Sequence, residues 1–183
     1  MKSKLSGSLV GIVIVAAIGS VFVAHYDDFL PYSWQTYAAP DGTFSIELPG
    51  KPVVETTQAP LEGGGNITFH LINAASTGSR AYSCSYVELE NASQKSTDQV
   101  LESARDGSLR KVQGTLLKQN QLIVQGFPGL QFQARVRGNS LMDSRMVLVG
   151  KRLYMVMAVA TAGEHTEPKT VQRMFDSFKL NLQ

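Results

Sequence analysis

Apolar and polar side chains alternate over most of this chain, and a period of two is typical of β-strands that bury one face. In the first half, the alternation predicts four strands, at residues 44–48, 53–58, 67–71 and 80–89. Residues 53–58 follow a break at residues 49–52 and are expected to return along the first strand. Before the first strand, Pro40-Asp41-Gly42 has the residue types of a turn. The first half is therefore expected to be mainly β-structure.

After Ser96, the spacing of apolar residues becomes that of a helix. An apolar stripe at helical spacing runs along this segment and consists of Val100, Leu101, Ala104, Leu109 and Val112. Ser96 or Thr97 is suited to cap the helix at its N-terminus. Because glycine weakens a helix, we expect this helix to be bent or split near Gly107.

The period of two returns after Gly114. It predicts one or two strands over residues 116–125 and a strand at residues 130–136, and the apolar runs at residues 142–149 and 153–160 predict two more strands. Turns are expected at residues 126–129 and at Gly150-Lys151, where the glycine suits a type II′ hairpin. A closing helix is predicted from Pro168 at its first position and from an apolar face formed by Val171, Met174, Phe175 and Phe178.

These elements define a fold class. They amount to seven or eight strands, one or two helices in the middle of the chain and one helix at its end. The hairpins make the sheet mostly antiparallel, and each amphipathic helix must bury its apolar face against that sheet. We therefore predict an α+β fold in which helices sandwich a mostly antiparallel sheet.

The N-terminal segment has a different composition. Residues 5–26 contain no Asp, Glu, Lys or Arg, with Lys2 and Lys4 before them and Asp27 and Asp28 after them. A helix of this length covers the hydrocarbon core of a bilayer, which is roughly 30 Å thick. The two lysines keep the N-terminus in the cytoplasm. The pattern predicts a single-pass protein with a tail at 1–4, a transmembrane helix or signal anchor at 5–26, a linker at 27–33 and an extracytoplasmic domain, periplasmic or at the cell surface, at 34–183.

A cleaved signal peptide is the alternative reading of this segment. Ala17-Ile18-Gly19 is a site with small residues at the required positions, and cleavage near Gly19 would release a secreted domain. Against cleavage, the apolar run continues through Ala24. Tyr26 and Trp34 then follow, and such aromatic residues favour the headgroup region.

The charge of the chain outside Lys2 and Lys4 is zero, with 15 basic and 15 acidic residues. A neutral domain is not expected to bind nucleic acid. The charges are unevenly placed, because residues 27–104 carry 3 basic and 10 acidic residues, and residues 105–183 carry 12 and 5. Either this asymmetry marks an interaction surface, or the two halves interleave in one fold and neutralise each other.

Cys84 is the single cysteine, so the chain cannot form an intramolecular disulfide. Its neighbours Tyr82 and Tyr86 share its face of a predicted strand. We expect Cys84 to be buried as a small apolar residue, and the alternative is a reactive thiol.

Four short motifs point to a known family. They are the segment 37–44 with its Asp41-Gly42 turn, the sequence FSIELPGKP at 44–52, GFPG at 126–129 and FDSF at 175–178. These motifs resemble those of the PsbP-like family, which includes the DcrB-like and LpqN-like envelope proteins. The resemblance implies an α/β/α sandwich over most of residues 33–182 and a binding or assembly role, often at membranes. It implies no cofactor, since the matching residues form turns or pack.

The sequence has no constellation typical of catalysis or metal binding. His25, His70 and His165 do not lie at ligand spacing, and the motifs of nucleophilic serines and phosphate loops are absent. Glu88 and Glu90 are expected to form a solvated strand face rather than a pair of glycosidase carboxylates. We therefore predict a non-enzymatic protein with no catalytic residue, no cofactor and no metal.

Three arginines form a candidate binding site. Arg135 and Arg137 share one face of a strand, and Arg145 is expected on the neighbouring strand. Guanidinium groups suit carboxylates and phosphates, so this row is a candidate site for an acidic protein loop or lipid headgroups. An ordinary solvated sheet face is the alternative.

Two functions remain open on the sequence alone, and neither specifies an oligomeric state. The first is a membrane-anchored extracytoplasmic domain that binds or assembles a protein partner without catalysis. The second is a small-ligand-binding protein or hydrolase whose site is scattered in sequence. A deep cleft with converging polar groups would favour the second function, and a flat, packed surface would favour the first.

Overall fold

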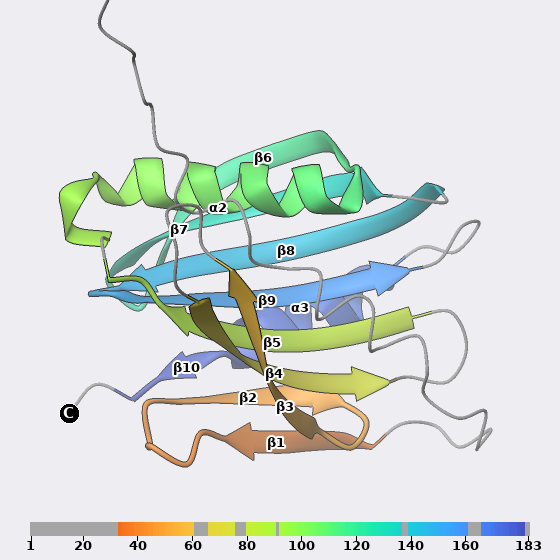
Figure 1. The fold of residues 1–183 in the computed structure, drawn as a ribbon. Coiled ribbons are helices and arrows are strands. Elements are labelled where there is room, and N and C mark those ends of the chain that lie inside the picture. The colour runs from red at the N-terminus through yellow and green to blue at the C-terminus, as the bar shows by residue number, and fades with distance from the viewer. Residues whose placement is uncertain are drawn as a thin grey trace, which may run out of the picture.

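Two antiparallel sheets make up most of the computed structural model (Figure 1). The structure describes residues 33–60, 66–75, 80–90, 92–136, 139–160 and 166–181. The smaller sheet has the order β1-β2-β10, with β1 (Trp34–Ala38), β2 (Phe44–Pro49) and β10 (Lys179–Leu180). The larger sheet has the order β3-β4-β5-β9-β8-β7-β6. Its strands are β3 (Val53–Pro60), β4 (Asn66–Ala75), β5 (Arg80–Glu88), β6 (Thr115–Val124), β7 (Phe127–Val136), β8 (Ser140–Val149) and β9 (Arg152–Ala160).

Helices occupy three segments of the described chain. They are the short 3-10 helix η1 (Ala92–Gln94), α2 (Thr97–Val112) and α3 (Pro168–Ser177). Every strand pair among the described residues is antiparallel. The prediction of a mostly antiparallel sheet covered by helices is thus confirmed.

The larger sheet is apolar on both of its faces. Along β9, Leu153, Met155 and Met157 belong to one buried cluster, whereas Tyr154 and Val156 belong to a second cluster. Successive side chains of a strand point to opposite faces, so the two clusters lie on opposite sides of the sheet. Each face therefore needs its own cover.

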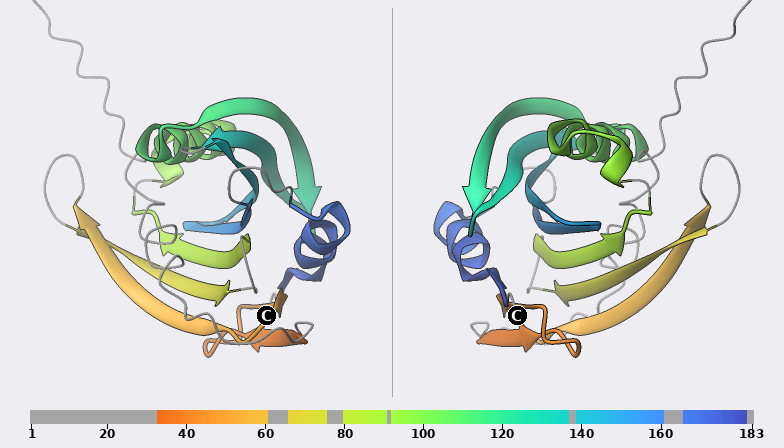
Figure 2. Two further views of the ribbon diagram at one scale, coloured as in Figure 1. Left: turned by 90° about the vertical axis from the view of Figure 1, so that its right-hand side faces the viewer. Right: turned by 90° about the vertical axis from the view of Figure 1, so that its left-hand side faces the viewer.

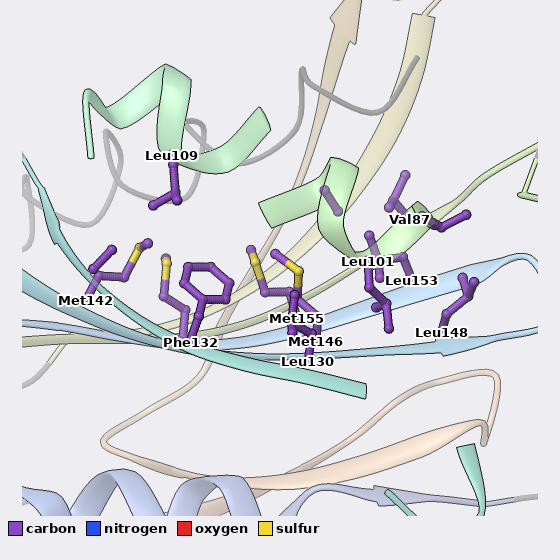
Figure 3. Close-up of a cluster of buried hydrophobic side chains, with 14 of the residues drawn as sticks. Val87, Leu101, Leu109, Leu130, Phe132, Met142, Met146, Leu148, Leu153 and Met155 are labelled. Carbon is purple, nitrogen blue, oxygen red and sulfur yellow. The ribbon is translucent and has the colours of Figure 1, made fainter. Parts of the chain in front are cut away.

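Helix α2 covers the first face. Figure 3 shows Leu101 and Leu109 of α2 directed at the methionines of the sheet. The helix begins with a capping box, in which the Gln99 N–H donates to Ser96 Oγ and the Ser96 N–H donates to Gln99 Oε1. Gly107 is buried within this one helix and does not split it. The expected split is absent because packing against the sheet outweighs the low helix propensity of glycine.

The smaller sheet and α3 cover the second face. Phe44 of β2 is fully buried, and its ring centroid lies 5.6 Å from that of Tyr86 and 5.4 Å from that of Tyr154 in the larger sheet. The Phe44 ring also lies 5.8 Å from the ring of Phe178, the residue that ends α3. One aromatic side chain thus contacts all three parts of this layered arrangement.

Helix α3 begins at Pro168, as predicted, and buries Val171, Met174 and Phe175. Figure 2 shows α3 between the smaller sheet and the β6–β7 hairpin. Gln125 in this hairpin fixes the end of the helix, because its Nε2 donates to the Phe178 carbonyl at 3.1 Å. The position of α3 is therefore set from both sides.

The predicted pairing of residues 53–58 is wrong. These residues lie in β3, which pairs with β4 of the larger sheet, whereas β2 belongs to the smaller sheet. The break at residues 49–52 therefore leads from one sheet to the other. Strands β1 and β10 were not predicted, because β1 shows no apolar alternation and β10 has only two residues.

The two hairpins of the second half also test the predictions. Gly150 has a φ of 60° in the turn between β8 and β9, as predicted. The turn expected at residues 126–129 lies instead at Gln125-Gly126, whose φ values of 50° and 89° fit a type I′ hairpin. Gly129 belongs to β7, where a Cβ atom would lie 2.8 Å from the Met146 carbonyl oxygen. This glycine is thus needed for packing rather than for a turn.

We expect Phe44→Ala to lower the free energy of unfolding by about 3–5 kcal/mol, because it leaves a cavity where three parts of the fold meet. Urea unfolding followed by circular dichroism measures this loss. The control is Val54→Ala, at a residue that is 55% exposed on β3, and its effect should stay within about 0.5 kcal/mol. Equal effects of the two substitutions would contradict the central position of Phe44.

Candidate functional site

The three candidate arginines have different environments. Arg135 is exposed on β7, Arg145 on β8 is mostly buried with 11% of its side chain accessible, and Arg137 lies outside the described residues. Arg145 pairs with Gln131 and Arg135 pairs with Leu141, so the two arginines face the same side of the sheet but lie about 13 Å apart along the strands. The structure does not bring them together.

Arg145 is held inside the protein. Its Nε and Nη2 donate to Gln131 Oε1 at 3.1 and 3.0 Å, and its Nη1 donates to the Phe175 carbonyl at 3.0 Å. Its guanidinium carbon lies 4.6 Å from the centre of the Phe175 ring, and Nη1 lies 3.5 Å from the Asp176 carboxylate. Burial lowers the pKa of Arg145, and Asp176 partly offsets this effect. Arg145 thus joins the end of α3 to the larger sheet.

A second polar group fills the space between the two arginines. Asp143 accepts hydrogen bonds from Gln133 Nε2 at 2.9 Å and from the buried Thr166 hydroxyl at 2.5 Å. Thr166 stands directly before α3. Both carboxylate oxygens of Asp143 thus accept hydrogen bonds from within the protein. Arg135 lies further along β7, past Gln133.

The densest polar cluster surrounds Arg152, at the start of β9. Arg152 Nη1 donates to Asp41 Oδ2 at 2.7 Å and to Thr43 Oγ1 at 2.9 Å, while its Nε donates to Glu88 Oε1. Asp41 and Thr43 belong to the turn between β1 and β2, and Glu88 ends β5. The cluster therefore fastens the smaller sheet to the larger one.

An aromatic stack supports this cluster. The ring of His70 on β4 lies parallel to the ring of Tyr86 on β5, with centroids 4.5 Å apart. The guanidinium carbon of Arg152 lies 4.8 Å from the centre of the Tyr86 ring. Since β5 lies between β4 and β9, His70 and Arg152 approach Tyr86 from opposite sides. His70 thus has a packing role in the described structure.

The pKa shifts in the cluster follow from these contacts. Partial burial acts to raise the pKa of Asp41, but hydrogen bonds from Thr43 and Arg152 outweigh it and lower the pKa to about 2. Partial burial acts to lower the pKa of Arg152, and its bonds to Asp41 and Glu88 reverse the direction and raise it. Both shifts favour the charged pair that joins the two sheets.

Ion pairs cross between the acidic and basic halves of the sequence. Arg152 pairs with Asp41 and Glu88, and Arg173 pairs with Glu47 at 2.9 Å. The halves therefore interleave, which favours mutual neutralisation over a single interaction surface.

The remaining candidates show no catalytic arrangement in the part of the chain that the structure describes. Glu88 is engaged by Arg152, and Glu90 lies in the turn after β5 rather than on the strand. No group of three potential metal ligands occurs among the described residues. His25 and His165 lie outside them. Cys84 is fully buried, as predicted, and burial raises the pKa of its thiol.

One open depression of about 440 Å³ is lined by described residues. It lies where α3 meets the smaller sheet and carries Glu47, Arg173, Asp176 and Lys179 on its rim. The opposite charges of these residues compensate one another. The depression lacks the enclosed apolar wall expected of a small-molecule site.

Residues 5–26, predicted to form the membrane anchor, and the alternative cleavage site near Gly19 lie outside the described residues and stay predictions. Within the described ranges, no helix combines the length and apolar composition needed to cross a bilayer. The structure therefore bears on the domain after the linker.

The fold is similar to solved structures of low sequence identity. The solution structure of cyanobacterial PsbP (CyanoP) from Synechocystis sp. PCC 6803 matches with a TM-score of 0.54 and 11% identity, over 87% of this chain and 99% of that chain. A crystal structure of PA94 from Pseudomonas aeruginosa matches with a TM-score of 0.38 and 13% identity, over 76% and 86% of the two chains. The second likeness is too weak to support an inference. No family model and no curated protein match the chain.

The first match shows that this chain has a PsbP-like fold, as its local motifs implied. Membership of the DcrB-like or LpqN-like families is not shown. The likeness concerns the fold alone, because sequence identity at this level does not carry a function across.

Sequence reasoning missed the Arg152 cluster. Asp41 was assigned to a turn and Glu88 to a solvated face, and nothing connected either of them with Arg152. Their separation in sequence, 111 residues for Asp41 and 64 for Glu88, explains this. The predicted β8–β9 hairpin could have indicated where Arg152 lies, since Arg152 is the first residue after the turn of this hairpin.

We expect the stabilising effect of Asp41 to depend on pH. Its folded pKa of about 2 lies below the ordinary value of 3.8, so its contribution is present above pH 3.8 and is lost as the pH falls toward 2. The difference in urea midpoint between the wild type and Asp41→Asn should therefore shrink between pH 4 and pH 2. A difference that stays constant over this range would contradict the lowered pKa.

We expect Arg145→Met to lower the free energy of unfolding by about 2–3 kcal/mol, because it leaves the Phe175 carbonyl and Gln131 without their charged partner. Arg135→Met is the matched control on the same sheet face. It should change stability by less than about 0.5 kcal/mol. Chemical denaturation of both variants measures the contrast, and a larger loss at Arg135 would reverse the assignment.

Proposed function

We propose that this protein is a membrane-tethered, extracytoplasmic accessory domain that binds an acidic segment of a protein partner without catalysis. The observation that supports this proposal most directly is the environment of the Arg135 side chain. In the part of the chain that the structure describes, the side chain of every other arginine takes part in a polar or ring contact, whereas the guanidinium of the exposed Arg135 makes neither a hydrogen bond nor an ion pair.

A free guanidinium on a rigid strand suits carboxylates. Its planar fork donates hydrogen bonds to two carboxylate oxygen atoms in fixed directions, and the strand holds it in place without a loop rearrangement. Arg137 lies two residues further along the sequence, so a second cation is close to Arg135 in the chain. Arg145 is not included, since its donors are already engaged.

The tether and the lack of catalysis rest on separate observations. Residues 5–26 have the length and composition of a membrane anchor, and Lys2 and Lys4 orient it with the domain outside the cytoplasm. The open depression and the Arg152 cluster, whose charged groups pair with one another, give no support to the alternative of a small-ligand binder or hydrolase. The PsbP-like fold is compatible with an accessory role.

We expect Arg135→Ala to fold normally and to reduce recovery of the partner about tenfold or more, because a charge pair at an interface is lost. The full-length tagged chain is captured from detergent-solubilised membranes, and co-purifying proteins are quantified by mass spectrometry. Lys169→Ala, which removes an exposed cation on α3, is the matched control and should recover the partner fully.

Three results would overturn the proposal. Unchanged recovery with Arg135→Ala would remove the arginine from the interface. Absence of the full-length chain from the membrane fraction would remove the tether. Turnover of a substrate by the purified protein would replace an accessory role by an enzymatic one.

A further inference from the structure

Strand β6 leaves one edge of the larger sheet open. It is the last strand of the sheet and pairs only with β7 among the described residues. Most of its side chains are exposed, including those of Leu116, Leu117 and Ile123, at 37%, 43% and 68%. In an antiparallel strand, the backbone polar groups of alternate residues point away from the neighbour. The outer edge of β6 therefore offers both hydrogen bonds and apolar surface.

The opposite edge of the sheet is better protected against strand addition. Strand β3 ends at Pro60, which has no N–H to donate, and it carries Glu55 within its length. Prolines and charges on an edge strand oppose pairing with another chain. Strand β6 likewise carries one charge, Lys118, and both edge strands expose apolar residues, but β6 contains no proline. All ten residues of β6 thus keep the backbone N–H that pairing with another strand requires, so β6 is the edge better suited to receive a strand.

The sequence of β6 is complementary to itself when it is read in the reverse direction. It runs Thr-Leu-Leu-Lys-Gln-Asn-Gln-Leu-Ile-Val, with a polar centre between two apolar ends. Two copies of such a strand that pair in antiparallel orientation place apolar ends against apolar ends. A foreign peptide would not require this symmetry in the strand that receives it. The pattern therefore favours a second copy of this chain as the occupant.

The faces of the strand define one register. Gln119 and Gln121 lie opposite Phe132 and Leu130, whose side chains belong to the cluster under α2, so both glutamines face α2. A two-fold axis perpendicular to the sheet keeps each face on its own side. With Asn120 on this axis, Gln119 of one copy meets Gln121 of the other on the α2 face.

The ends of the strand also fit this register. On the opposite face, Lys118 of one copy meets Leu122 of the other, so the two lysines do not face each other. The pairing between β6 and β7 shifts between Leu116 and Lys118, which places Leu116 opposite Ala134 on the α2 face. This shift brings Leu116 of one copy opposite Ile123 of the other, on the same face, and cross-strand apolar pairs of this kind stabilise a sheet.

We propose that β6 pairs with β6 of a second copy of this chain about a two-fold axis at Asn120, so that the larger sheets of two molecules form one continuous sheet. The interface consists of backbone hydrogen bonds and the apolar pairs at both ends of β6. The observations behind this pairing, on the edge of β6, are separate from the free guanidinium of Arg135 on β7.

Disulfide trapping tests the register in the full-length chain in detergent micelles. Asn120→Cys places the two thiols opposite each other, with Cα atoms about 4.5–5.5 Å apart, within the range that a disulfide spans. Lys118→Cys is the matched control, because the two copies of residue 118 are about 13 Å apart in this register. The native Cys84 is buried and offers no competing thiol.

After mild oxidation, we expect a covalent dimer from Asn120→Cys and none from Lys118→Cys. Adding Ile123→Lys to the Asn120→Cys variant should weaken dimerisation about tenfold, because it replaces both apolar end pairs. Light scattering of the unmodified chain should show twice the protein mass of a monomer. A monomeric mass, equal cross-linking at positions 118 and 120, or a disulfide to a different protein would each overturn the proposal.

Discussion

The structure depends on the burial of both faces of one antiparallel sheet. Along β9 the two faces carry Met155 and Tyr154 in alternation, and neither face is polar enough to meet water. An antiparallel sheet commonly leaves one face exposed to solvent, but here both faces are apolar and both must be covered. The chain must therefore supply two covers, which are α2 on one side and the smaller sheet with α3 on the other. Each of the other features of the fold attaches these covers to the sheet.

Arg152 and Arg145 attach the covers of the second face to the larger sheet. Arg152 ties the β1–β2 turn to β5 and β9, and Arg145 ties the end of α3 to β8. Both use the planar guanidinium to bond several acceptors in fixed directions, a geometry that the ammonium group of lysine does not provide. The ion pairs of Arg152 and Arg173 also join the basic half of the sequence to acidic residues of the other half. The guanidinium groups of Arg145 and Arg152 are therefore engaged in contacts within the protein rather than with a partner.

The sequence predicted the elements well where apolar positions alternate with polar ones, as in residues 130–136, and where an apolar run follows turn residues, as in residues 153–160. The predictions failed where the role of a residue depends on contacts with a segment distant in sequence. Gly129 has the composition of a turn, and only the approach of the Met146 carbonyl shows why it belongs to a strand. Arg145 alternates with apolar residues like a solvent-facing residue, but α3 covers it. The polar positions of a strand thus define its second face without showing whether another layer lies above it.

Covering layers bury the faces of a sheet, but they leave its edges to other devices. Both edge strands carry one charge and exposed apolar residues, but β3 ends at Pro60, whereas β6 contains no proline. An edge of the second kind favours aggregation unless a defined partner occupies it. In the proposed dimer, the symmetric pairing of β6 closes this edge with its own sequence. Burial of the faces and closure of the edge are thus separate requirements of the same sheet, and the proposed pairing meets the second.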